Sequence, residues 1–213
     1  MAEAAGLNVG VGGNIGTPVL DLLKSPKDLY VLELSSFQLE TTFSLKPEAA
    51  VILNLSEDHL DRYDGMQGYL AAKQRIFNGA SKIVVNRDDA STYPPQHEIW
   101  HSFGLNEHDY GRVVVNNELY LSIDGEALFA VNELNIVGAH NQMNALAAMA
   151  LADAVNIPRD AQLAVLKAFT GLKHRCQFVR EVNGVRWIND SKATNVGSTL
   201  AAVAGVSESV QVS

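Results

Sequence analysis

Leu29-Tyr-Val-Leu-Glu-Leu-Ser-Ser-Phe-Gln-Leu-Glu40 opens with a short apolar run that stops at Glu33, and the hydroxyls of Ser35 and Ser36 follow. A run of this length, rich in β-forming residues and without polar alternation, is typical of a strand buried on both faces. Such strands belong to parallel α/β sheets, whose ligands bind beyond the carboxyl ends of the strands. Glu33 is therefore predicted to lie at a ligand or metal site. The alternative is a solvated carboxylate at a strand end.

A second apolar run, Ala49-Ala-Val-Ile-Leu-Asn-Leu55, ends in the loop Ser56-Glu-Asp-His-Leu-Asp-Arg-Tyr63. Four side chains of this loop could bind a metal ion, namely Glu57, Asp58, His59 and Asp61. A charged loop is often only solvated, but this is the second strand in succession to end in possible metal ligands. Mg²⁺ prefers oxygen ligands and needs few from the protein. The two strand ends together therefore predict a Mg²⁺ site that serves phosphate chemistry.

The loop Gly12-Gly-Asn-Ile-Gly-Thr-Pro18 lies between a predicted strand at Asn8–Val11 and an apolar segment. This order can cradle phosphates, but the chain contains no Gly-Lys-Ser/Thr of a Walker loop. The glycine spacing is G-x-G-x-x-x-G rather than the dinucleotide fingerprint, although Glu33 follows at the distance of a ribose-binding acid. An NAD-dependent oxidoreductase is thus one alternative, and glycines that only permit a tight turn are another. Asn14 is the polar side chain of this loop that could reach a ligand.

The remaining pattern predicts an α/β fold, with a mostly parallel sheet flanked by helices and a small antiparallel hairpin appendage. A helix is expected over Met66–Asn78, with Lys73 in its middle, and a strand over Lys82–Asn86. The turn signals Asn116-Asn117 and Asp124-Gly125 predict hairpins. A helix from Gly138 to about Val155 and another over Asp160–Phe169, which we expect to cover the sheet, complete the first domain. We place that domain at residues 1–171 and the start of a second α/β domain at 172–213.

Two further groups of side chains are candidates for nucleotide binding. His140, Asn141 and Asn144 lie in the first turns of the Ala-rich helix, where backbone amides and the helix dipole favour anionic or polar ligands. Capping would explain one Asn on its own. In the second group, Arg175 and Lys192 could bind phosphate oxygens, and Asp190 could accept hydrogen bonds from a sugar or base.

Composition excludes several classes of protein. The net charge of -8 and the absence of a basic patch argue against nucleic-acid and membrane-surface binding. A single cysteine, Cys176, cannot form an internal disulfide, which fits a reducing compartment. No apolar span reaches membrane length. We expect a cytoplasmic monomer whose partners are small molecules. The patterns at both ends also suggest a piece of a larger protein.

Five motifs, read together, resemble the Mur ligases of peptidoglycan synthesis, and within them the members that add D-glutamate. They are Leu32-Glu-Leu-Ser-Ser-Phe-Gln-Leu-Glu40, Asn54-Leu-Ser-Glu-Asp-His-Leu-Asp-Arg-Tyr63, Gly138-Ala-His-Asn-Gln-Met-Asn144, His174-Arg175 and Trp187-Ile-Asn-Asp-Ser-Lys-Ala-Thr-Asn195. The resemblance covers essentially the whole chain. It implies an ATP-dependent ligase that phosphorylates the carboxylate of UDP-N-acetylmuramoyl-L-alanine, so that the amine of D-glutamate can attack the acyl phosphate.

The resemblance also implies a role for each candidate residue. Glu33 matches a ligand of a first Mg²⁺, and His59 a ligand of a second, which the lysine carbamate at Lys73 would support. Asn14 and Ser36 match contacts to the UDP-sugar. ATP contacts are matched by His140, Asn141, Asn144, Arg175 (γ-phosphate) and Asp190 (ribose or base). Lys192 and Thr194 match residues that face the reacting carboxylate and D-glutamate.

The sequence departs from the family pattern in what it lacks. The Gly-rich P-loop ending in Gly-Lys-Ser/Thr and the UDP-binding N-terminal domain are not found in it, and neither is most of the D-glutamate pocket. A P-loop supplies the phosphate cradle and a hydroxyl ligand for Mg²⁺. We therefore expect this chain alone to be an inactive fragment of the ligase, and a folded fragment without any catalytic role is the further alternative.

Overall fold

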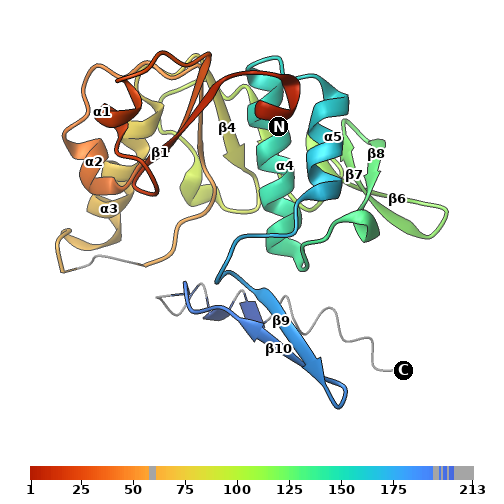
Figure 1. Cartoon of the computed structure of the whole chain (residues 1–213). Helices are drawn as coiled ribbons and strands as arrows, with labels where there is room; N and C mark the ends of the chain where they lie inside the picture. The colour runs from red at the N-terminus through yellow and green to blue at the C-terminus, as the bar shows by residue number, and fades with distance from the viewer. Residues whose placement is uncertain (58–60, 194–196, 198, 201, 204–213) are drawn as a thin grey trace.

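The structure is a computed structural model that describes residues 1–57, 61–193, 197, 199–200 and 202–203 (Figure 1). Three of the predicted site candidates, Asp58, His59 and Thr194, lie outside these ranges, so their predicted roles are not tested. Among the described residues, no helix has the length and apolar character needed to cross a membrane.

The largest sheet in the described part of the chain has six strands. Their order is β3 (Ala49–Ile52), β4 (Lys82–Asn86), β5 (His101–Phe103), β6 (Tyr110–Val115), β7 (Glu118–Ile123) and β8 (Glu126–Ala130). The pairs from β3 to β6 are parallel, and β6, β7 and β8 pair in antiparallel fashion. The predicted parallel sheet and the predicted hairpins are therefore one continuous sheet. Strand β5, which the sequence pattern did not predict, joins the two parts.

Both predicted hairpin turns are confirmed. Asn116 and Asn117 have φ angles of 51° and 68°, and Asp124 and Gly125 have φ angles of 50° and 80°. Positive φ at both central residues gives a turn whose twist matches that of the flanking strands, and Asn, Asp and Gly adopt this conformation most readily. The turn residues thus set the register of β6, β7 and β8.

Helix α4 (Ala139–Ala154) packs across β3, β4, β5 and β6, and its alanines allow a close approach to the sheet. Leu146 and Met149 are fully buried and belong to the same core cluster as Val84 and Leu121 of the sheet. Helix α5 (Arg159–Ala168) lies beside α4 and packs against the 3₁₀ turn η1 (Glu3–Ala5) (Figure 1). The two helices were both predicted, but α4 rather than α5 provides most of the cover over the sheet.

Strands β1 (Val9–Gly13) and β2 (Leu29–Glu33) form a separate parallel pair. The predicted end of the strand at Glu33 is confirmed, but the predicted burial on both faces is wrong. Val31, in the middle of β2, is 48% exposed. The physical reason is that burial depends on neighbours, and within the described residues β2 pairs with β1 alone. Strand β4, between β3 and β5, is buried from Ile83 to Asn86.

The segment between β2 and β4 carries the helices that surround the acidic loop. They are α2 (Ser36–Glu40), α3 (Gly65–Gln74) and the 3₁₀ turn η2 (Arg75–Phe77). Together α3 and η2 confirm the predicted helix, which ends before Gly79 (φ 73°). Phe77 is fully buried in a second core cluster with Ile52 and Val85. The shorter elements are α1 (Val19–Leu22), η3 (Ala90–Thr92) and η4 (Val131–Glu133).

The last described strands are the antiparallel pair β9 (Gln177–Val182) and β10 (Val185–Asn189), joined by a turn at Asn183-Gly184. Figure 1 shows this hairpin extending from the connector that follows α5. The described residues between 197 and 203 are helical. The domain boundary at residue 172 stays a prediction.

Candidate functional site

Glu33 and Asn14 lie together at the carboxyl end of β2. The Asn14 amide donates to the backbone carbonyl of Glu33 at 2.6 Å, and Asn14 Nδ2 donates to Glu33 Oε1 at 3.1 Å. Gly13 makes this approach possible, because a Cβ atom there would lie 2.3 Å from the Glu33 carbonyl oxygen and its φ is 113°. Glu33 is exposed at the strand end. The two residues predicted from separate motifs are therefore one polar pair that could contact a ligand.

The turn after Glu33 is a capping box, a feature that the sequence interpretation missed. The Ser35 hydroxyl accepts from the Gln38 amide at 3.2 Å, and the Ser35 amide donates to Gln38 Oε1 at 2.9 Å. The pattern Ser-x-x-Gln before an apolar residue would have indicated it. Ser36 begins α2 and is 1% exposed, and its predicted contact with a sugar stays a prediction.

The loop after β3 is fixed to the end of β4. Asn86 Nδ2 donates to the Leu53 carbonyl at 2.8 Å, and the Leu55 amide donates to Asp89 Oδ2 at 3.0 Å. The carboxyl ends of these two parallel strands are thereby held together, where ligands of α/β proteins bind.

The far end of the same loop is fixed to α2. Arg62 Nη2 donates to Glu40 Oε2 at 2.9 Å, and its guanidinium lies 5.2 Å from the centre of the Phe37 ring. Phe37 in turn stacks on Tyr63, with ring centres 6.1 Å apart. The hydrogen bond from Arg62 is the main reason why the pKa of Glu40 is lowered.

The described residues contain only part of the predicted metal site. Glu33 is in place, and Lys73 lies on α3 with Nζ 5.8 Å from the centre of the Tyr69 ring. Within the described ranges, no group of three or more His, Cys, Asp or Glu side chains could hold a metal ion. A Mg²⁺ ion at Glu33 would therefore take its other ligands from water, from a bound phosphate or from residues outside these ranges.

The predicted nucleotide contacts in the first turns of α4 are brought together. The helix begins after Gly138, whose φ is 95°. Asn141 Nδ2 donates to the Val137 carbonyl at 2.7 Å, and Asn144 Nδ2 donates to Asn141 Oδ1 at 3.5 Å. His140 is half-buried beside them. The start of the helix therefore presents a polar surface at the positive end of the helix dipole.

The connector before β9 and the segment after β10 are joined by hydrogen bonds. The Cys176 amide donates to Asp190 Oδ1 at 2.9 Å, and the Lys192 amide donates to the His174 carbonyl at 3.1 Å. Arg175 and Lys192 are both exposed on this junction. The predicted group of Arg175, Asp190 and Lys192 is thus brought to one place.

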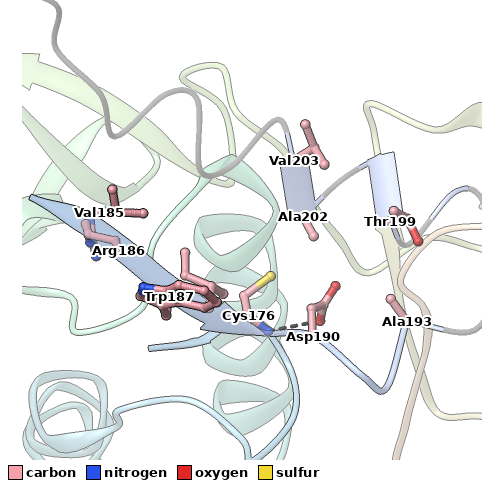
Figure 2. Close-up of a pocket in the computed structure, with 10 residues that line it drawn as sticks. Cys176, Val185, Arg186, Trp187, Asp190, Ala193, Thr199, Ala202 and Val203 are labelled. Carbon is pink, nitrogen blue, oxygen red and sulfur yellow. Dashed lines mark hydrogen bonds between the residues drawn. The ribbon is translucent and has the colours of Figure 1, made fainter. Parts of the chain in front are cut away.

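A hollow of about 580 Å³ lies beside this junction, between β10 and the helical residues that follow (Figure 2). Its walls are mainly apolar and include Val185, Trp187, Ala202 and Val203. Burial, and then the Asp190 carboxylate, raise the pKa of the Cys176 thiol at its rim. Arg186 and Asp190 also line the hollow, and the phosphate-binding roles of Arg175 and Lys192 stay predictions.

Comparison with known proteins matches residues 13–152 to the Mur ligase middle domain. The chain is 56% identical, over 97% of its length, to a UDP-N-acetylmuramoylalanine–D-glutamate ligase of Aliivibrio fischeri. It is 56% identical, over 99% of its length, to the ligase of the same name from Pseudomonas savastanoi. The chain spans 47% and 48% of the lengths of these two relatives.

Solved structures of low sequence identity share the fold. MurF from Acinetobacter baumannii is 22% identical with a TM-score of 0.71, over 93% of this chain and 49% of that one. A pseudomurein peptide ligase from Methanothermus fervidus is 20% identical with a TM-score of 0.72, over 98% of this chain and 52% of that one. The motif resemblance and the predicted α/β fold class are both confirmed, and the chain belongs to the Mur ligase family, whose middle domain it contains.

Proposed function

We propose that this chain is part of an ATP-dependent ligase that adds D-glutamate to UDP-N-acetylmuramoyl-L-alanine in cytoplasmic peptidoglycan synthesis. The observation that carries the proposal is the name shared by the relatives that are 56% identical over nearly the whole chain. The Glu33–Asn14 pair and the polar start of α4 support it, because both lie at element ends where α/β proteins bind ligands.

The proposed reaction depends mainly on positioning and on neutralising charge. ATP phosphorylates the substrate carboxylate, and the amine of D-glutamate then displaces phosphate to form the amide. Arg175 binds the γ-phosphate, while Lys192 and Thr194 face the reacting carboxylate and D-glutamate. Asp190 and the first turns of α4, with His140, Asn141 and Asn144, bind the nucleotide.

The other assigned residues hold the UDP-sugar and the metal ions. Asn14 and Ser36 contact the UDP-sugar. Mg²⁺, held at Glu33 and at His59 with a Lys73 carbamate, would neutralise charge on the phosphates when bound. Because the sequence has no Walker loop, we propose that residues 1–213 do not turn over by themselves.

An assay of the chain and of a full-length relative tests this proposal. Phosphate release from MgATP should require both UDP-N-acetylmuramoyl-L-alanine and D-glutamate in the relative, and the 213-residue chain should release none. Replacing the lysine equivalent to Lys73 by Ala in the relative should abolish most of its phosphate release, and small carboxylates should restore part of it. Full activity of that variant would reject the carbamate role.

The oxidoreductase alternative loses its support with the family assignment. Titration with NAD⁺ and with MgATP separates the two. Binding of NAD⁺ without any response to ATP would overturn the ligase proposal. A folded fragment that binds no ligand at all would be recognised by the absence of both responses.

A further inference from the structure

The first turn of α4 is fixed to the sheet by a side chain that has no role in the proposal above. Arg112 of β6 donates from Nη1 to Gln142 Oε1 at 2.8 Å and from Nε to the Leu105 carbonyl at 2.9 Å. Gln142 lies next to Asn141 and one turn of helix from the start of α4. One guanidinium therefore contacts a loop of the sheet and the turn that carries the proposed nucleotide contacts.

The loop that Arg112 contacts is itself fixed to the carboxyl end of β4. The Leu105 amide donates to Asp88 Oδ2 at 2.8 Å. Arg87 donates from Nε and Nη2 to the side-chain and backbone oxygens of Asn106, at 2.5 and 2.7 Å. The hydrogen bonds thus run without a break from the end of β4 through Leu105 and Arg112 to Gln142.

This connection matters because it ties the first turn of α4 to the sheet through side-chain hydrogen bonds in addition to packing. The residue before the helix is Gly138, which has no side chain to cap the first turn. The opposite end of the same helix is held separately, since Lys82 Nζ at the start of β4 donates to the Ala154 carbonyl. A planar guanidinium can hold two acceptors in fixed directions, which an ammonium group cannot do as well.

We infer that Arg112 is a positioning residue for nucleotide binding, which it promotes by holding the first turn of α4 in one orientation relative to the end of β4. The inference rests on the proposed nucleotide contacts of Asn141 and Asn144. Arg112 itself contacts no ligand in this assignment.

The test uses the 213-residue chain, with MgATP as the probe and calorimetry or amide NMR shifts as the measure of affinity. Arg112→Gln should weaken ATP binding about five-fold, the effect of one or two lost hydrogen bonds. Arg112→Lys should keep part of the ATP affinity that Arg112→Gln loses. The control Lys82→Gln removes a hydrogen bond at the other end of α4 and should change affinity less than two-fold, while lowering the unfolding temperature at least as much as Arg112→Gln. Unchanged ATP affinity in Arg112→Gln would overturn the inference.

Amide hydrogen exchange without nucleotide separates this inference from the proposed function. Arg112→Gln should speed exchange in the first two turns of α4, and Lys82→Gln should not. Equal exchange in the two variants overturns the positioning role. If Asn144→Ala leaves ATP affinity unchanged, the proposed nucleotide site fails instead, and the exchange result still decides whether Arg112 orients the turn.

Discussion

Strands β4 and β2 are similar in sequence and differ in their surroundings. Both are five-residue apolar strands that pair in parallel and end in a polar residue, Asn86 or Glu33. Strand β4 lies between two strands under α4 and is buried, whereas β2 pairs with β1 alone in the described chain and is half exposed. An apolar run therefore specifies a strand, and its neighbours decide how much stability the strand contributes.

The largest difference in unfolding free energy between the two regions should appear when one aspartate in each region is replaced by alanine. Asp153 of α4 accepts hydrogen bonds from the Tyr110 hydroxyl and Arg159 Nη2, both at 2.6 Å, and from Gln162 Nε2 at 2.7 Å. Burial and then the bond to Asp153 raise the pKa of Tyr110 far above its usual range. Asp153→Ala would leave these three donors without their acceptor in a partly buried network, so the free energy of unfolding should fall by about 3 kcal/mol.

The matched variant for that network is Asp28→Ala, beside β2. Asp28 accepts one exposed hydrogen bond, from the Asn8 amide at 2.8 Å, and its loss should lower the free energy of unfolding by less than about 1 kcal/mol. Urea unfolding followed by circular dichroism measures both variants. Equal losses would mean that the β1–β2 pair is as strongly integrated as the six-stranded sheet, contrary to the comparison.

A pair of valines tests burial alone. Val84 of β4 is fully buried, and Val84→Ala should lower the free energy of unfolding by about 2 kcal/mol through lost transfer energy and a small cavity. Val31→Ala on β2 should lower it by less than about 1 kcal/mol, because half of that side chain is already in water. Thermal unfolding of the two variants gives the comparison, and an equally large effect at Val31 would show that something covers β2 in solution.

Much of the fold followed from local sequence signals. Hairpin turns such as Asn116-Asn117 carry their conformational preference in the residues themselves, and the Gly138 and Gly79 helix boundaries are local in the same way. Strand β5 was missed because three residues, His101–Phe103, show no periodicity and are specified by the strands on either side. The exposure of β2 was missed for the same reason, since pairing partners are not encoded within the strand.

The candidate site was predictable as a set of residues and not as a geometry. Asn14 and Glu33 come from separate motifs, and only the fold shows that they form a hydrogen-bonded pair. Ser36 lies in an informative motif, and only the fold shows that it is buried at the start of α2. Arg112 lies in an ordinary β-strand pattern, and its link to Gln142 spans 30 residues, so no local signal indicates it.

The loop from β5 to β6 joins the two parts of the sheet. The Asp109 carboxylate in this loop should make the free energy of unfolding depend on pH. Burial would raise the pKa of Asp109, but hydrogen bonds from the Ser102 hydroxyl and amide, and then the nearby imidazoles of His108 and His101, bring it below its usual value. A lowered folded-state pKa contributes stability that is present above the unfolded value of about 3.9 and is lost as the pH falls through the folded value.

Asp109→Asn should therefore lower the free energy of unfolding at pH 7 by about 1 kcal/mol, and the gap from the unmodified chain should narrow below about pH 4. Unfolding curves of both proteins, recorded from about pH 3 to about pH 7, measure this gap on both sides of the unfolded-state pKa of about 3.9. A gap that stays constant down to the lowest pH would mean that the carboxylate charge has no part in holding the loop from β5 to β6.

The smallest predicted change is an increase in the free energy of unfolding, and it comes from replacing a serine in the same sheet. Ser122 of β7 is fully buried, and its hydroxyl has no hydrogen-bond partner among the described residues. A buried hydroxyl without a partner costs free energy, so Ser122→Ala should raise the free energy of unfolding by about 0.5 kcal/mol or more. Ser102→Ala is the matched control, because the Ser102 hydroxyl donates to Asp109 Oδ2 at 2.7 Å and its removal should destabilise the chain. If both substitutions destabilise equally, the Ser122 hydroxyl has a partner in solution, and the buried sheet satisfies its polar groups as completely at β7 as it does at β5.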